Sequence, residues 1–273
     1  HRIGDSAIIR GGAKLNRLGY SGVTQRQFPA YVHQVDLRPL LYPARGQEAA
    51  ADAELTPMNR QLPAIFLTSV AMARLFESWG VTPSAYLGHS VGEIAAACVA
   101  GIITLEQAAK VIVHRGRFMD ECETHDGTML AVGTSPDEAR AVIARHGRTV
   151  SIAAFNGPRS LTLSGPRSEL SAIAAELESQ GVFARFLKVS HPFHHALMQP
   201  AADALHAALA DLMPAAETIP FFSTVTGRRM DGMDCTADHW SGGVRQPVEF
   251  AAAVGAVAEF GADVWLEVGA HPA

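Results

Sequence analysis

Apolar residues recur along the chain at two different periods, and this predicts a mixed α/β protein. Between residues 60 and 79 they share one helical face, and Gly80 ends that helix. Short apolar runs bounded by turn residues predict strands at 84–87, 219–225 and 262–268. Further helices are expected between these strands, at residues 94–100, 104–119, 196–212 and 248–258. Strands that alternate with helices favour a largely parallel sheet covered by helices.

Residues 127–189 follow an order of their own. The pattern predicts strand, helix, strand, strand, helix, strand, with the helices at 136–146 and 166–180. This βαββαβ order is that of a ferredoxin-like unit. We therefore expect residues 127–189 to form a small ferredoxin-like subdomain inserted into a core made of residues 1–126 and 190–273. Residues 1–56 give no clear element.

Composition excludes several classes of function. With 273 residues, of which 48% are hydrophobic, the chain can bury a sizeable core. The net charge of −5 and the absence of a dense Lys/Arg run argue against a nucleic-acid partner. No apolar run reaches the roughly 18 residues of a membrane span. The abrupt ends, His1 and Ala273, lead us to expect a domain of a longer polypeptide.

The three cysteines, Cys98, Cys122 and Cys235, are scattered and show no CxxC spacing. This argues against a disulfide framework and against a zinc site, so no metal is expected. Buried thiols in a reducing, cytoplasmic compartment are the simplest interpretation.

The sequence Gly88-His89-Ser90-Val91-Gly92-Glu93 lies between a predicted strand and a predicted helix. A serine between two glycines at such a turn is typical of the nucleophile elbow of acyl-transfer enzymes. The helix N-terminus offers backbone N–H groups to a developing oxyanion, and that of Val91 is one candidate.

Arg115 falls in the apolar stripe of its predicted helix, where a guanidinium needs an anion or several acceptors. Periodicity leaves two interpretations open. Arg115 either forms a buried ion pair with a core carboxylate or binds a substrate carboxylate in its planar fork. Arg117 is expected to be a solvated charge.

A serine nucleophile needs a base, and the twelve histidines supply the candidates. His191, His194 and His195 cluster in a loop, which is a usual place for catalytic residues. Spacing alone does not choose among them. A metal site is disfavoured there because no Cys or acidic partner lies at ligand spacing. His89 is expected to pack the elbow rather than to act as the base.

These residues together resemble the acyltransferase domains of type I polyketide synthases and the malonyl-CoA:acyl-carrier-protein transacylases. Gly88–Glu93 resembles their GHSxGE motif, and Arg115 lies 25 residues after Ser90, where the family has an arginine that binds the extender carboxylate. His191-Pro192-Phe193-His194 resembles the HAFH loop, whose last histidine is the family's base. Further segments that resemble the family are 156–160, 244–248 and 267–272.

The resemblance implies an α/β-hydrolase-like core with a parallel sheet plus the inserted ferredoxin-like subdomain. It implies a Ser90–His194 dyad in which a backbone carbonyl, rather than a carboxylate, orients the histidine. Gln61 and His89 are expected to lie near the substrate. The implied reaction moves a malonyl unit from malonyl-CoA to Ser90 and then to the phosphopantetheine thiol of an acyl carrier protein. No cofactor bound by the domain itself is implied, and the implied partners are the carrier protein, a ketosynthase and other synthase domains.

The specificity loop, with His191 and Phe193, indicates a preference for malonyl units. In the family HAFH accompanies malonyl and YASH accompanies methylmalonyl, so Phe193 leaves less room for an α-methyl group. Rejecting one methyl group is worth only about 1–3 kcal/mol, so the expected preference is incomplete. Here Pro192 replaces the usual alanine.

The family begins with a GQGxQ-type segment whose backbone contributes to the oxyanion hole. Residues 1–56 contain no such segment, and Gly46-Gln47 is the nearest fragment. Two rival hypotheses stay open beside the transacylase, and this departure suggests the second of them. One is a hydrolase such as a thioesterase, which would need an acid to complete a Ser–Asp–His triad and would have no use for Arg115. The other is a catalytically inactive docking module.

Overall fold

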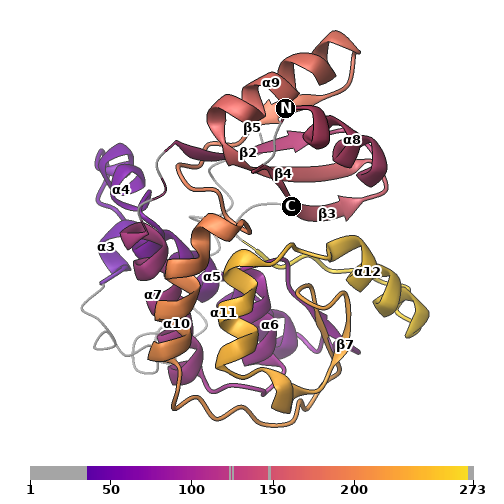
Figure 1. Cartoon of the computed structure of the whole chain (residues 1–273). Helices are drawn as coiled ribbons and strands as arrows, with labels where there is room; N and C mark the ends of the chain where they lie inside the picture. The colour runs from indigo at the N-terminus through magenta and orange to yellow at the C-terminus, as the bar shows by residue number, and fades with distance from the viewer. Residues whose placement is uncertain (1–35, 123, 125, 147–148, 270–273) are drawn as a thin grey trace.

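The computed structural model describes residues 36–269, except 123, 125, 147 and 148 (Figure 1). The described part is a mixed α/β structure with two separate sheets. Its larger, mostly helical part lies below the smaller sheet in the view of Figure 1. The predicted mixed α/β class is confirmed.

The larger part holds a short three-stranded sheet in the order β1-β6-β7. The strands β1 (Tyr86–Leu87) and β6 (Phe221–Ser223) are parallel, whereas β7 (Arg228–Met230) is antiparallel to β6. The sheet is therefore smaller and less parallel than the pattern predicts. The helices of this part are α3 (Arg38–Leu41), α4 (Glu48–Glu54), α5 (Met58–Ser78), α6 (Gly92–Val99), α7 (Leu105–Glu121), α10 (Gln199–Ala208), α11 (Ala237–Arg245) and α12 (Phe250–Glu259), with short 3₁₀ turns at Ala196–Met198 and Gly232–Asp234.

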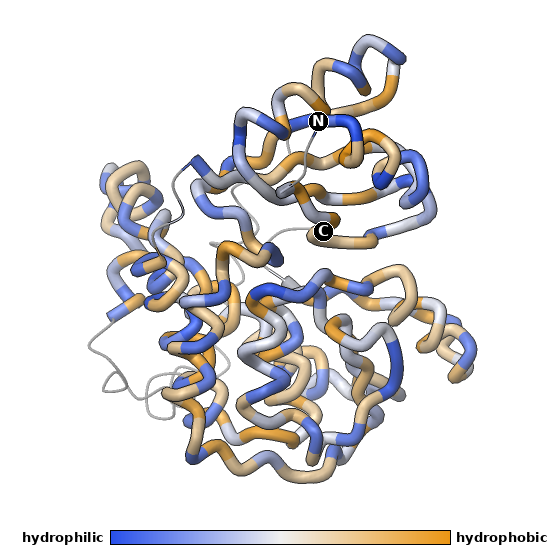
Figure 2. The backbone as a smooth tube through the Cα atoms, viewed as in Figure 1, coloured by the Kyte–Doolittle hydropathy of each residue, from blue (hydrophilic) through white to orange (hydrophobic). Residues whose placement is uncertain are grey.

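Helices α5, α6, α7, α10 and α11 pack around one apolar cluster. Apolar and polar positions are interleaved along α5, α7, α10 and α11, as an amphipathic helix requires (Figure 2), whereas α6 is buried from Glu93 to Val99. The spacing of Thr104 and Gln107 in the sequence predicts a capping box at the start of α7. It is confirmed, because the Gln107 N–H donates to the Thr104 hydroxyl and the Thr104 N–H donates to the Gln107 side chain. All three cysteines are buried with free thiols.

The smaller part contains β2 (Gly127–Val132), α8 (Pro136–His146), β3 (Ser151–Gly157), β4 (Ser160–Pro166), α9 (Arg167–Ser179) and β5 (Ala184–Phe186). The predicted βαββαβ order is thus observed. The strands form one antiparallel sheet in the order β3-β4-β2-β5, and a second apolar cluster lies between the sheet and its two helices.

The two parts are joined at the edge of the small sheet. The Phe155 N–H on β3 donates to the Val248 carbonyl at 2.8 Å, and the Val248 N–H donates to the Ala153 carbonyl at 2.8 Å. The segment between α11 and α12 therefore extends the small sheet at its β3 edge. This pairing covers backbone groups that an edge strand otherwise leaves open.

The predicted strand at 262–268 is wrong. These residues follow α12 without regular secondary structure and without a sheet partner among the described residues, and Val264 is 84% exposed. An apolar run predicts a strand only where another strand edge is within reach, and the sequence does not carry that information. The pattern also overlooked α3, α4, α11 and β7, and it extended the helix at 196–212 beyond the observed end of α10.

Among the described helices, none is both long and apolar enough to cross a membrane.

The packing of α7 against the start of α5 depends on Gly116. A Cβ atom at this buried position would lie 2.4 Å from the Met58 carbonyl oxygen and 2.8 Å from the Asn59 Cα, and both are backbone atoms. We expect Gly116→Ala to lower the free energy of unfolding by about 1–3 kcal/mol, because α5 must move. Gly255→Ala on α12, where a Cβ meets no atom, is the matched control and should raise stability by up to about 1 kcal/mol. Chemical denaturation of both variants measures the difference, and equal effects would contradict the proposed contact.

Candidate active site

Ser90 lies in a tight turn between β1 and α6. Its φ is +49°, which is uncommon for a residue with a side chain and is typical of a strained elbow. Gly88 permits the turn, because a Cβ there would lie 2.3 Å from the backbone nitrogen of Glu93. Gly92 has no such contact. Val91 is the N-cap of α6, and the first N–H groups of a helix have no intrahelical acceptor.

The side chain of His194 is hydrogen-bonded to that of Ser90, although the two residues lie 104 positions apart in the sequence. Its Nε2 lies 2.8 Å from Ser90 Oγ, and its Nδ1 lies 2.8 Å from the carbonyl oxygen of Gln246. Because a carbonyl only accepts, Nδ1 carries the proton and Nε2 is left as the acceptor for the serine hydroxyl. The His194 N–H donates to the Val244 carbonyl at 3.1 Å, which holds the loop residue at its φ of +57°.

The electrostatics of the site keep His194 neutral. Burial and, after it, the nearby Arg115 charge lower the pKa of His194 to about 3, although the hydrogen bond to Gln246 opposes this shift. At neutral pH the imidazole is therefore the free base. A neutral imidazole beside a serine hydroxyl has the protonation state that a general base requires.

Arg115 reaches the same point from α7. Its side chain is almost fully buried, its Nη2 donates to the Gly243 carbonyl at 3.1 Å and lies 3.4 Å from Ser90 Oγ, and its Nε has no hydrogen-bond partner. Burial lowers the pKa of Arg115 to about 10, and the negative charge of Glu93 opposes this, so the guanidinium stays charged at neutral pH. Within the described residues it has no carboxylate at ion-pair distance. The geometry therefore disfavours the first of the two interpretations of Arg115, the buried ion pair with a core carboxylate.

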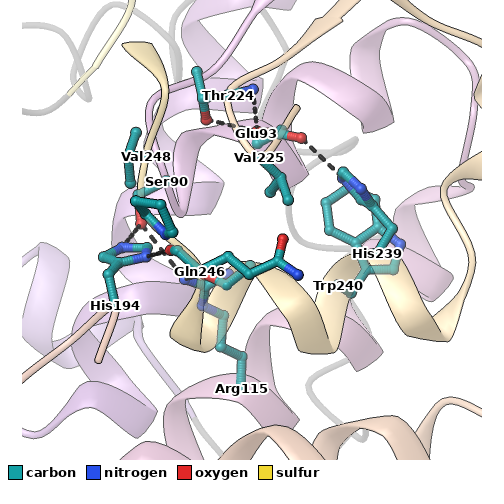
Figure 3. Close-up of a pocket in the computed structure, with 12 residues that line it drawn as sticks. Ser90, Glu93, Arg115, His194, Thr224, Val225, His239, Trp240, Gln246 and Val248 are labelled. Carbon is teal, nitrogen blue, oxygen red and sulfur yellow. Dashed lines mark hydrogen bonds and ion pairs between the residues drawn. The ribbon is translucent and has the colours of Figure 1, made fainter. Parts of the chain in front are cut away.

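Ser90, Arg115 and His194 line one small cavity (Figure 3). The remaining wall comes from Glu93, from the end of β6, and from α11 with the segment that follows it. Sequence reasoning did not single out Glu93, His239 or Gln246. The resemblance of segment 244–248 to the family was a signal for Gln246, whereas nothing in the sequence pointed to His239.

The other predicted residues do not line this cavity. The His89 ring packs on Phe250, and its Nε2 bonds to the Asn156 side-chain oxygen at 2.8 Å, as expected for a residue that packs the elbow. Gln61 is half-buried on α5. His191 stacks on Phe193, and Phe193 packs against the large apolar cluster.

His195 is used structurally, because its ring bonds to the Thr149 carbonyl and to the Leu197 N–H. No group of His, Cys, Asp and Glu side chains in the described part of the chain is arranged to hold a metal ion. Gly46-Gln47 precedes α4 and does not line the cavity. The residues before 36, where the rest of the missing N-terminal motif was sought, lie outside the described part.

Comparison with known proteins identifies the family of this chain. The acyl transferase domain family matches residues 40–273. The chain is 39% identical over 210 residues to erythronolide synthase EryA2 of Saccharopolyspora erythraea and 38% identical over 243 residues to mycoketide-CoA synthase of Mycobacterium tuberculosis. These matches cover 77% and 89% of this chain, but only 6% of each of those much longer proteins.

Solved structures agree. The acyltransferase domain from the second module of the salinomycin polyketide synthase has a TM-score of 0.80 at 34% identity, over 96% of this chain and 58% of that one. The malonyl CoA-acyl carrier protein transacylase of Clostridium perfringens has a TM-score of 0.81 at 26% identity, over 90% of this chain and 78% of that one. Since the family match spans nearly all of the described residues, and the relatives are polyketide synthases, this chain belongs to the acyl transferase domain family.

Proposed function

We propose that this chain is the acyltransferase domain of a type I polyketide synthase that loads malonyl units onto an acyl carrier protein. The observation that carries the proposal is the convergence of three groups in one buried cavity, namely Ser90 Oγ, a neutral His194 and a charged Arg115 that has no carboxylate at ion-pair distance among the described residues. A nucleophile, a base and an anion-binding group are what transfer of a carboxylated acyl unit requires.

The proposed reaction has two halves. His194 Nε2 takes the proton of Ser90, and Oγ attacks the thioester carbon of malonyl-CoA while the Val91 N–H stabilises the oxyanion. The carbon–sulfur bond breaks, and the coenzyme A sulfur leaves with the proton held by His194. His194 then takes the proton of the phosphopantetheine thiol, whose sulfur attacks the carbonyl carbon of the malonyl ester. The carbon–oxygen bond to Ser90 breaks, and Oγ leaves with the proton held by His194. This is a ping-pong mechanism in which the domain needs no bound cofactor of its own.

The Gln246 carbonyl takes the place of the usual acid of a catalytic triad. It fixes the tautomer of His194 and accepts a hydrogen bond from the imidazolium that forms during attack. A carbonyl has no full negative charge, so the imidazolium is stabilised less than by an aspartate. A carboxylate at this position would have favoured the thioesterase hypothesis, and the assembled Ser90–His194 contact weighs against an inactive docking module.

Arg115 is proposed to bind the malonyl carboxylate and His191-Phe193 to restrict the α-substituent. Phe193 packs against the large apolar cluster, which limits its freedom to move away from a bulkier acyl group. Gln61 and His89 are proposed to support the substrate from the rim of the cavity. Discrimination against one methyl group is expected to be about 10- to 200-fold.

The division of the chain into a core and a subdomain is also proposed from the resemblance to the acyltransferase family. Residues 1–126 and 190–273 are proposed to form the α/β-hydrolase-like core and residues 127–189 the inserted ferredoxin-like subdomain. The observed order β3-β4-β2-β5 with two helices on one face supports the second assignment. The proposed partners are an acyl carrier protein and the ketosynthase and other domains of a synthase.

Ser90→Ala should abolish acylation. We expect the parent to form a malonyl adduct within seconds of mixing with malonyl-CoA, with much less methylmalonyl or acetyl adduct, as measured by intact-protein mass spectrometry. Ser179→Ala, which alters an exposed serine at the end of α9, should behave as the parent. An adduct that persists in Ser90→Ala, or no adduct in the parent, would refute the proposed function.

Arg115→Ala should lower the rate of acylation by malonyl-CoA by about 10- to 100-fold, because a charge-assisted hydrogen bond to the carboxylate is lost. Acylation by acetyl-CoA, which has no carboxylate, should not fall. Arg117→Ala is the matched control, since Arg117 is a half-exposed partner of Glu121 on the same helix. Equal losses with both thioesters would contradict a carboxylate-binding role.

The pH dependence follows from the lowered pKa of His194. Because the free base predominates well above a pKa of about 3, the acylation rate should stay nearly constant between pH 8 and pH 5. A histidine with an ordinary pKa of about 6.5 would lose roughly 30-fold over the acid part of this range. Initial rates at constant ionic strength measure the difference. A tenfold fall per pH unit below 6.5 would show that His194 titrates normally in the working enzyme.

A further inference from the structure

Both groups that act on Ser90 are held by one helix end. The carbonyl of Gly243 on α11 accepts from Arg115, the carbonyl of Val244 accepts from the His194 N–H, and the carbonyl of the C-cap residue Gln246 accepts from His194 Nδ1. Ser90 itself precedes α6. The alignment of base and cation with the nucleophile therefore depends on how α11 sits against α6.

A buried contact joins these two helices at the level of the cavity. Glu93 lies in the first turn of α6, and its Oε1 lies 2.8 Å from Nε2 of His239 in the first turns of α11. The two side chains are only 2% and 4% exposed. The other carboxylate oxygen accepts from the Thr224 N–H at 2.8 Å and lies 2.7 Å from the Thr224 hydroxyl, so the end of β6 is joined as well (Figure 3).

This contact is a poor device for stability alone. Taking a carboxylate out of water costs free energy that its hydrogen bonds only offset, and a well-packed apolar pair at such a site is often as stable. What hydrogen bonds add is a fixed geometry. The Glu93 charge also opposes the effect of burial on Arg115, as stated above, and so favours the charged guanidinium.

We infer that Glu93 and His239 form a positioning pair that keeps the carbonyl groups of α11 in register with Ser90. Neither side chain touches the reacting atoms in this inference. They act through Gly243 and Gln246, whose carbonyls hold Arg115 and His194. The inference rests on the proposed function in one respect, namely that Ser90 is the group acylated.

The test compares three histidine variants. His239→Phe keeps a ring of similar size and removes the donor, whereas His239→Gln keeps an N–H donor for Glu93. His206→Phe is the matched control, because His206 pairs with Asp238 of α11 across an exposed surface, with its side chain 52% exposed. Each full chain is mixed with a fluorophosphonate, which labels an activated serine, and separately with malonyl-CoA. The rate and the final extent of Ser90 modification are read by intact-protein mass spectrometry.

The expected result is a loss of rate at full extent. His239→Phe should modify Ser90 completely but about 10- to 100-fold more slowly with both reagents, as displacement by a fraction of an ångström to an ångström implies. His239→Gln should recover to within about threefold of the parent, and His206→Phe should match the parent.

Two outcomes would overturn the inference. One is a rate of Ser90 modification in His239→Phe equal to that of the parent, whatever the final extent of modification. A residue needed only for folding would lower the number of active molecules, and so the extent, but not the rate. The other is a loss in His239→Gln as large as in His239→Phe. If His239→Phe does not fold, Glu93→Gln takes its place and the same criteria apply. A parent that reacts with the fluorophosphonate but not with malonyl-CoA would refute the proposed function and leave the positioning pair to be judged by the fluorophosphonate rates.

Discussion

The site depends on holding a histidine as a free base while it is buried next to a permanent cation. Burial and Arg115 both disfavour the imidazolium of His194, and the Gln246 carbonyl supplies the opposing interaction. A carboxylate bound to Arg115 would offset that cation at the moment when a proton must move to His194. In the proposed reaction, substrate charge is therefore part of the acid–base machinery, and an acyl group without a carboxylate meets a less basic histidine.

The backbone, rather than acidic side chains, arranges this chemistry. Ser90 stands where a strand meets a helix in a turn that only a glycine at position 88 allows. Three carbonyl groups at the end of α11 direct Arg115 and His194 toward it. Carbonyl oxygens do not titrate, so these three acceptors, unlike a carboxylate, are not lost by protonation. The one buried carboxylate in the cavity wall, Glu93, points away from the reacting atoms toward His239 and Thr224.

The sequence predicted the elements whose signals are local. Spacing and turn residues predict the capping box at Thr104, the helix α8 and the βαββαβ order of elements in the smaller part. They also predict the inward placement of Arg115. His194 could be chosen among twelve histidines only through resemblance to the family. The Gln246 carbonyl leaves no trace in residue type, and the contact of Glu93 with His239 spans 146 positions. The prediction of a strand at 262–268 was wrong because strand pairing depends on tertiary structure.

The small sheet contacts residues next to the site through its edge strand β3. Gln246 offers its carbonyl to His194, and two residues later Val248 pairs with the β3 edge through both of its backbone groups. On the other side of Ser90, His89 bonds to Asn156 on the same strand. Ser90 is thus one residue from a contact with β3, and Gln246, which orients the base, is two residues from another. Hydrogen bonds therefore tie both the Gln246 carbonyl and the elbow to the same strand of the small sheet, β3.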